Sequence, residues 1–197
     1  MGNLFDSKDI ENVIKNSVSV KQAILNDKSL IDNILKACNG VISIYKNNRK
    51  VLFCGNGGSA ADAQHLAAEF SGRYYLDRPA LNAEALHVNT SFLTAASNDF
   101  GFNKAYARMV EALGVEGDLL IAISTSGNSL NIVEAINEAK NKKMKVIGLT
   151  GDTGGKMKDI CDILLNVPSK DTPRIQESHI LIGHIICEFV EKALFEK

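Results

Sequence analysis

The spacing of apolar residues changes character near Lys50. From residue 8 to residue 48, apolar side chains recur at intervals of three and four, which predicts helices and no strand. Asp27 or Ser29 is suited to cap the second of these helices. We expect the apolar face of that helix to consist of Leu30, Ile31, Ile34, Leu35, Val41, Ile42 and Ile44.

Beyond Lys50, short apolar runs alternate with segments of helical spacing. Strands that alternate with helices are typical of a parallel sheet covered on both faces. The predicted fold class is therefore α/β, a three-layer domain with a five-stranded, mostly parallel sheet flanked by helices. The predicted strands are residues 51–54, 83–88, 119–124, 146–150 and 163–167, and the predicted helices are residues 59–71, 91–96, 104–112, 129–142 and 174–197.

The length and net charge of the chain further limit its possible domain organisation and function. A chain of 197 residues without an internal repeat or a low-complexity linker predicts one domain, 1–197, with residues 1–48 as an N-terminal helical segment. The net charge of −1 disfavours a surface dedicated to nucleic acid or to an anionic membrane. No apolar run approaches bilayer length, and the first residues lack the features of a secretion signal, so we expect a cytoplasmic protein.

The four cysteines support the same compartment. Cys38, Cys54, Cys161 and Cys187 are far apart in the chain, and each has apolar neighbours. Free cysteines in such surroundings usually behave as small buried hydrophobic residues. A disulfide framework or a zinc site made of thiolates is therefore not expected.

Residues 121–129 turn from an apolar strand into a run of hydroxyl side chains, followed by an amphipathic helix. A strand that enters a helix through glycine presents free backbone N–H groups and the positive end of the helix dipole. An ordinary loop with Asn128 or Ser129 as helix cap is the alternative. Four hydroxyl groups in six residues exceed what one cap needs. The pattern predicts a phosphate cradle made by Ser124, Thr125, Ser126 and Ser129.

A glycine turn follows the first predicted strand. Residues 54–60 contain a formal G-x-G-x-x-A match, but the next strand ends at 87–89 without the carboxylate that a dinucleotide site needs. NAD binding is therefore a weak alternative. Ligands gather beyond the carboxyl ends of parallel strands, so we expect this turn and the hydroxyl-rich loop around one crevice. The glycine-rich turn after Thr150 belongs to the same edge, although such turns are more often plain connections.

His65 and Glu69 lie four residues apart, on one face of the helix that starts from the glycine turn. This spacing permits shared metal coordination or a hydrogen-bonded acid–base pair. For an isolated pair, a surface glutamate and an ordinary helix histidine are the commoner outcome. The start of this helix at the expected crevice favours a functional role.

The last predicted helix carries a second histidine candidate. His184 lies in an almost wholly apolar stretch, which fits either core packing or a histidine tuned for catalysis. Helical geometry does not choose between Gln176 and Glu177 as its companion. His87 and His179 are candidates on composition alone and rank low.

Together, these motifs resemble the bacterial sedoheptulose-7-phosphate isomerases, also called phosphoheptose isomerases, which have the SIS (sugar isomerase) fold. The resemblance runs from the N-terminal helices to the last helix. It is carried by Cys54–Ser59, by the helix with His65 and Glu69, by Ser71–Tyr74, Asn98–Phe102 and Ser124–Ser129, and by Arg174–Glu177 with His179 and His184.

This resemblance implies a homotetramer with active sites at subunit interfaces, in which residues 1–48 pack on the domain and in the oligomer. It implies one zinc ion per subunit, bound by His65, Glu69, Gln176 and His184, which spacing alone could not establish. Some members have an aspartate where this chain has Pro173, and Asp171 or Thr172 could replace it. The implied substrate contacts are Asn56, Gly57, Gly58, Ser59, Glu69, Asn98, Asp99, Ser124, Thr125, Ser126, Ser129 and Gln176.

The expected reaction converts D-sedoheptulose 7-phosphate to D-glycero-D-manno-heptose 7-phosphate through an enediol, the first step toward activated heptose for surface glycans. Glu69 and His184 are expected to share the proton transfers, with the roles of base and acid open. One alternative is a non-catalytic SIS-fold regulator that binds the replication initiator, but such a protein lacks residues matching Glu69 and His184. The other is an isomerase of a different sugar phosphate.

Overall fold

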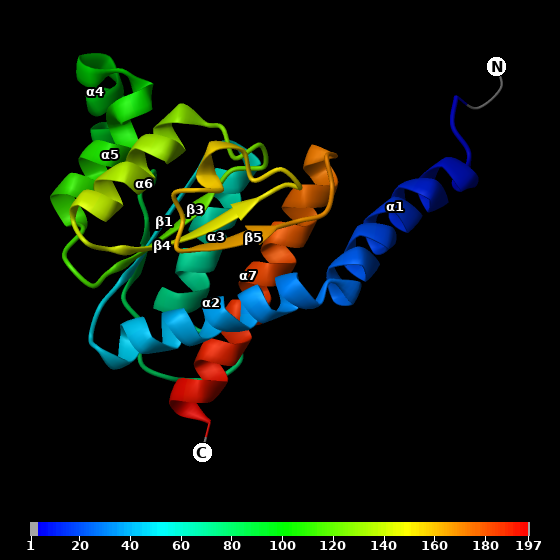
Figure 1. The fold of residues 1–197 in the computed structure, drawn as a ribbon, viewed down its shortest axis with the longest axis horizontal. Helices are drawn as coiled ribbons and strands as arrows, with labels where there is room; N and C mark the ends of the chain where they lie inside the picture. Colours follow the sequence, from blue (N-terminus) through cyan, green and yellow to red (C-terminus); the bar gives the residue numbers. More distant parts are fainter. Residues whose placement is uncertain (1–3, 197) are drawn as a thin grey trace.

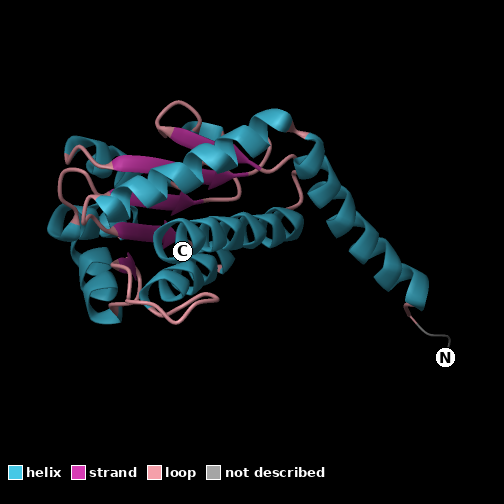
Figure 2. Ribbon diagram, turned by 90° about the horizontal axis from the view of Figure 1, so that it is seen from below, coloured by secondary structure: helices cyan, strands magenta, loops and turns pink. Residues whose placement is uncertain are grey.

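A parallel sheet of five strands forms the centre of the protein, and helices cover both of its faces (Figures 1 and 2). The computed structural model describes residues 4–196. The strand order is β2-β1-β3-β4-β5, and every neighbouring pair is parallel, which confirms the predicted fold class. The strands are β1 (Val51–Gly55), β2 (Ala83–Ala85), β3 (Leu119–Ile123), β4 (Lys145–Thr150) and β5 (Ile163–Asn166).

The strand pattern follows from burial on both faces. All residues of β1 and β3 are buried, which explains why these strands are continuous apolar runs. The prediction of a strand over residues 83–88 was wrong in its second half. Leu86 is buried, but its backbone belongs to a turn that the Val88 N–H closes on the Ala85 carbonyl. An apolar residue in a buried turn therefore gave the same sequence pattern as a continuing strand.

The predicted helices are all present, with ends that differ by a few residues. The largest difference is α4, which extends through Asn98 and Asp99, whereas the prediction ended at residue 96. A short 3₁₀ helix, η1 (Gly155–Met157), was not predicted. The predicted end of the last helix at Lys197 lies outside the described residues. The helices are α1 (Ser7–Asn26), α2 (Lys28–Lys46), α3 (Gly58–Ser71), α4 (Thr90–Phe100), α5 (Phe102–Leu113), α6 (Leu130–Asn141) and α7 (Thr172–Phe195).

The helices form two layers with separate apolar cores. On one face, α2, α3 and α7 bury residues such as Leu66 and Ile182 against Phe53 of β1. On the other face, α5 and α6 bury Val110 and Ile136 against the sheet. No helix within residues 4–196 combines the length and the apolar character that crossing a bilayer requires. Cys38, Cys54, Cys161 and Cys187 are free thiols, as predicted.

The N-terminal helices pack less completely than their sequence indicates. Asp27 caps α2, because its side chain accepts a hydrogen bond from the Leu30 N–H at 3.0 Å. The predicted apolar face of α2 was too wide, since Ile31 and Leu35 are 41% and 51% exposed. Helix α1 projects away from the sheet (Figure 2). Its exposed apolar residues include Ile10, Val13, Ile14, Val18 and Leu25.

Candidate active site

Helices α3 and α7 lie side by side and bring three of the predicted metal ligands together. Their close approach depends on Gly183, where an added Cβ would overlap the Leu66 side chain. The Nε2 atom of His65 lies 2.9 Å from Nε2 of His184 and 3.3 Å from Oε1 of Glu69. One ligand atom from each residue lies within 4.8 Å of the others. The cluster joins segments that are 119 residues apart in the chain.

The donor set of this cluster suits a zinc ion. Two imidazole nitrogens and one carboxylate oxygen are common zinc ligands, and bond lengths of about 2 Å require donors a few ångströms apart. Burial, followed by the neighbouring His65, lowers the pKa of His184, which favours the neutral ring that binds metal. Two ring nitrogens at 2.9 Å can share only one proton, so one donates and the other accepts.

Asp62 belongs to the same region and was missed in the sequence. Its Oδ2 atom is buried and has no hydrogen-bond partner among the described residues. Burial raises the pKa of Asp62 to about 6, although the charge of His65 opposes this shift. The available signal was the three-residue spacing from His65, which places both side chains on one helix face.

The structure separates Gln176 from Glu177, which the sequence could not do. Glu177 accepts a hydrogen bond of 2.6 Å from the Ser17 hydroxyl and therefore faces α1. Gln176 lies against Gly58, where an added Cβ would overlap its amide group. Gln176 thus faces the start of α3. Its backbone is about 12 Å from that of His184 along α7, at a rise of about 1.5 Å per residue.

The glycine turn at residues 55–58 is held in place from two sides. Gly57 has a φ of +55°, a conformation that favours glycine, and Gly58 has no room for a side chain beside Gln176. Asn56 exchanges two hydrogen bonds of 2.8 Å with Asn131 at the start of α6. Ser59 is buried in the first turn of α3. The turn therefore has one fixed shape at the carboxyl end of β1.

The hydroxyl-rich loop lies at the carboxyl end of β3. Ser129 occupies the cap position of α6, yet its side chain makes no capping hydrogen bond. Its Oγ atom lies 3.0 Å from Oγ of Ser124 instead. Ser129 therefore has the cap position that the alternative interpretation gave it, but its side chain does not cap α6. Thr125, Ser126 and Asn128 line one side of a hollow of about 270 Å³ beside this loop.

The glycine-rich turn after β4 supports the hydroxyl-rich loop. The Gly151 N–H donates to the Thr125 carbonyl at 2.9 Å, and the Met157 N–H donates to the Gly127 carbonyl at 3.2 Å. Gly127 has a φ of +65° and packs so closely on Gly154 that a side chain would overlap its carbonyl. This turn is therefore more than a connection, since it fixes the shape of the predicted phosphate cradle.

The residues predicted to surround one crevice lie in two separate places within one subunit. The cradle and the glycine turn lie at the carboxyl edge of the sheet, as expected. His65 and Glu69 lie about 10 Å and about 16 Å farther along α3 from Gly58, at a rise of about 1.5 Å per residue. The expectation that this pair adjoins the crevice because its helix starts there was therefore too simple.

Asn98 and Asp99 lie apart from both places. They are exposed on α4, where the Asn98 side-chain amide donates to the Asp99 carboxylate at 3.0 Å. Figure 1 places α4 at the opposite side of the sheet from α7. The subunit alone therefore does not bring these two residues to His184.

A hollow larger than the one beside the cradle lies elsewhere in the described part of the chain. It has a volume of about 650 Å³ and lies at the amino ends of β3, β4 and β5, opposite the cradle. Arg49, Lys143 and Lys145 line it. Its size reflects a gap between α2 and the sheet edge, and none of the predicted site residues borders it.

His179 is a core residue and His87 lies outside the cluster of His65, Glu69 and His184. The His179 ring is wholly buried, and its Nε2 atom lies 3.1 Å from the Thr150 carbonyl, where an N–H would donate. Burial lowers the pKa of His179 to about 4. The low rank of His179 as a ligand agrees with this position.

The buried His179 should make folding sensitive to acid. Its pKa lies below the ordinary value of 6.5, so the unfolded chain takes up the proton first. The free energy of unfolding should therefore be highest above pH 6.5 and fall as the pH drops toward 4, by about 3 kcal/mol at about 1.4 kcal/mol per pKa unit. Urea unfolding of the wild type and of His179→Asn at several pH values measures this term. An equally steep acid dependence in both proteins would contradict it.

Comparison with known proteins agrees with the fold. The class is that of proteins with a SIS domain, whose family model matches residues 15–151. The phosphoheptose isomerase of Aneurinibacillus thermoaerophilus is 53% identical over 94% of this chain and 94% of its own. Phosphoheptose isomerase 2 of Campylobacter jejuni is 55% identical over 92% of this chain and 90% of its own. The chain belongs to the phosphoheptose isomerase family.

A solved structure supports this assignment. The phosphoheptose isomerase of Neisseria gonorrhoeae superposes with a TM-score of 0.88 at 42% identity, over 94% of this chain and 98% of that protein. The similarity thus extends beyond the sheet to the helices that carry His65, Glu69 and His184.

Proposed function

We propose that this sugar-phosphate isomerase converts D-sedoheptulose 7-phosphate to D-glycero-D-manno-heptose 7-phosphate. The observation that carries the proposal is the convergence of Glu69 and His184 from two helices, in a chain of the phosphoheptose isomerase family. A ketose–aldose conversion moves a proton between two carbons and a second proton between two oxygens. A carboxylate and an imidazole in contact range supply both functions.

The proposed mechanism assigns the proton transfers to Glu69 and His184, one acting on carbon and the other on oxygen. The lowered pKa of His184 keeps its ring able to accept a proton near neutral pH. His65, Glu69 and His184 would hold a zinc ion, which when bound would polarise the substrate carbonyl, and Gln176, which faces Gly58 in this structure, is the proposed fourth ligand. His65 also contacts both proton-transfer residues and so restricts their orientation.

The proposed phosphate anchor is the loop of Ser124, Thr125, Ser126 and Ser129. Ser129 is suited to this role because its hydroxyl does not cap α6 and instead lies beside that of Ser124 in the same loop. The start of α6 adds N–H groups and the positive end of a helix dipole. The remaining proposed substrate contacts are Asn56, Gly57, Gly58, Ser59, Asn98, Asp99 and Gln176.

We further propose a homotetramer with active sites between subunits. Two observations support it: the phosphate anchor and the acid–base pair are separated along α3 within one subunit, and α1 exposes a stripe of apolar residues. Exposed apolar stripes of this kind usually mark interaction surfaces. In this view residues 1–197 form one domain, and residues 1–48 also pack against other subunits. Light scattering of the purified protein measures the assembly directly.

A panel of phosphorylated ketoses tests the substrate. Proton NMR in deuterated water should reveal conversion of D-sedoheptulose 7-phosphate, together with exchange of the transferred hydrogen. Pentulose and hexulose phosphates should react far more slowly. Faster turnover of one of these shorter sugars would contradict the substrate, and tight binding of a replication initiator without any turnover would contradict the reaction.

The proposed place of this reaction is the start of activated heptose synthesis for a surface glycan such as lipopolysaccharide or capsule. We propose that it occurs in the cytoplasm, where sugar phosphates are made. The four free cysteines are consistent with a reducing compartment.

A further inference from the structure

A carboxylate buried at the far end of α7 is completely occupied by protein donors. The Glu191 side chain is 2% exposed. It accepts hydrogen bonds from the backbone N–H groups of Tyr74, Tyr75 and Leu76 at 3.1, 2.7 and 2.9 Å. The Nε atom of Arg78 donates a fourth at 3.0 Å. Burial alone would raise the pKa of Glu191, but these donors outweigh it and lower that pKa, so the group is charged.

The partner cation binds the helix that carries Glu69. The Arg78 side chain is also 2% exposed. Its Nη2 atom donates to the Glu69 carbonyl at 2.9 Å, and its Nη1 atom donates to the carbonyls of Phe70 and Gly72 at 2.7 and 3.1 Å. These carbonyls lie at the C-terminal end of α3. The last carbonyls of a helix have no N–H donor within the helix, and the helix dipole favours a cation there.

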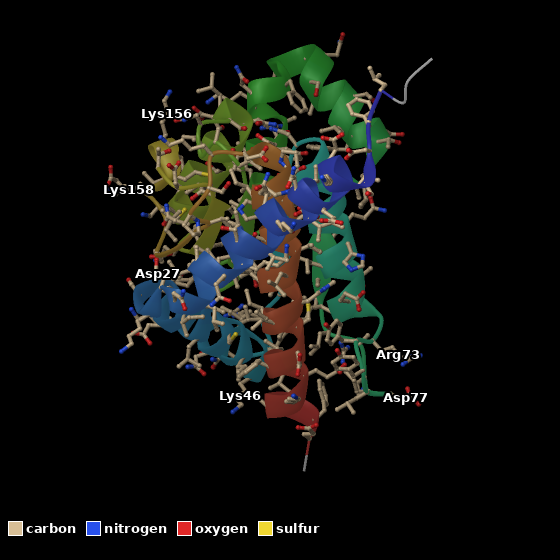
Figure 3. All side chains as sticks on the ribbon, turned by 90° about the vertical axis from the view of Figure 1, so that its right-hand side faces the viewer. Asp27, Lys46, Arg73, Asp77, Lys156 and Lys158 are labelled. Carbon is tan, nitrogen blue, oxygen red and sulfur yellow. The ribbon has the colours of Figure 1, made fainter. Side chains whose placement is uncertain are left out.

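The ion pair therefore joins the two helices of the candidate site. Glu191 follows His184 by seven residues, two turns along the same side of α7. Arg78 contacts the backbone of Glu69 itself. Figure 3 shows the connecting segment, marked by Arg73 and Asp77, at the end of α3 beside the last turns of α7. Through this contact, the position of Glu69 relative to His184 depends on groups that touch neither side chain.

We propose that the buried Arg78–Glu191 pair is a positioning device that sets the Glu69 carboxylate against His184. The proposal rests on the proposed function, in which these two residues transfer protons. A buried ion pair is a weak source of stability, because desolvation offsets much of its attraction. It can, however, specify a geometry, since the planar guanidinium holds four backbone carbonyls, including that of Pro79, and one carboxylate in fixed directions.

Two conservative variants test this role. Arg78→Lys keeps the charge but has one nitrogen in place of Nε, Nη1 and Nη2, which bind Glu191, the Phe70 carbonyl and the Glu69 carbonyl from three separate positions. Glu191→Gln keeps the shape and one acceptor oxygen. A displacement of about 1 Å at reacting groups can cost about 100-fold in rate. We therefore expect kcat to fall about 10- to 100-fold in Arg78→Lys, less in Glu191→Gln, with KM changed less than about twofold because the phosphate anchor is untouched.

Zinc binding gives a readout that does not require turnover. Competition with a coloured chelator should show zinc affinity reduced about 10-fold in Arg78→Lys, the low end of the effect of losing a supporting contact. Arg108→Lys is the matched control, because Arg108 pairs with Glu111 on the exposed surface of α5. Its kcat and zinc affinity should equal those of the wild type.

The outcomes separate this proposal from the proposed function. Wild-type kcat and zinc affinity in both well-folded variants would overturn the positioning role. Losses of kcat and zinc affinity that are explained by a loss of folded protein would also overturn it, since they would indicate a structural role only. Melting temperature and subunit assembly measure the loss of folded protein. Absence of heptose-phosphate turnover in the wild type would overturn the proposed function, whereas a weakened zinc site in Arg78→Lys would still support the positioning of Glu69.

Discussion

Glu69→Gln should lower kcat for D-sedoheptulose 7-phosphate by about 1,000-fold, within the range of about 10² to 10⁴ that general acid–base groups contribute. The substitution keeps the size of the side chain but removes its ability to accept a proton. The folded state should be retained, because the Glu69 side chain is partly exposed and its only side-chain ion pair within residues 4–196 is with His65. Arg78 binds the Glu69 backbone carbonyl, which the substitution leaves in place.

Proton NMR of substrate conversion measures this effect, and light scattering checks that the assembly is unchanged. Glu188→Gln is a suitable control, because Glu188 lies on α7 near His184 but pairs with Lys192 on the surface. The control should retain wild-type turnover. Full turnover by Glu69→Gln would remove Glu69 from the mechanism, whereas loss of assembly would show that the residue has a structural role.

The fold could be predicted almost entirely from the sequence because its signals are local. Strands buried on both faces, such as β1 and β3, are continuous apolar runs, and the helices between them keep helical spacing. The errors arose where burial and backbone conformation differ. Leu86 is buried in a turn, and Ile31 and Leu35 are apolar but exposed on α2. Apolar character alone does not report which face is covered.

The candidate site was predictable only in its local parts. The four-residue spacing of His65 and Glu69 is visible in one helix, and the hydroxyl-rich loop is visible as a short motif. Their relation to His184 depends on Gly183 packing against Leu66, a contact between distant segments. The resemblance to phosphoheptose isomerases indicated His184 and Gln176, whereas helical geometry alone did not distinguish Gln176 from Glu177 as the companion of His184.

The Arg78–Glu191 pair shows most clearly what could not be predicted from the sequence. Its members are 113 residues apart, and neither belongs to a spacing pattern or a motif. A charged residue near the end of an amphipathic helix predicts a solvated side chain, since such residues are almost never fully buried unless paired. Only the path of residues 72–79 across the end of α7 brings three N–H groups and a guanidinium to Glu191.

Removal of bound metal by a strong chelator should reduce turnover to the background level, and one zinc ion per subunit should restore it. The structural reason is the contact between His65 and His184, whose Nε2 atoms lie 2.9 Å apart. Without a cation, these nitrogens share a proton, and the cluster has no metal charge with which to polarise the substrate carbonyl. A cation bound by both rings and Glu69 would separate them and fix their orientation.

His65→Asn distinguishes this explanation from a general effect of the chelator. The variant loses one donor of the cluster, so zinc affinity should fall about 10- to 100-fold or more, and restoration should require correspondingly more zinc. His87→Asn is the control, because His87 lies outside the cluster, and it should regain activity at the wild-type zinc concentration. Zinc content measured by atomic absorption must follow turnover in each protein. Full turnover in a wild-type preparation shown to be free of metal would refute the zinc site, and the acid–base pair would then have to act on the substrate without a cation.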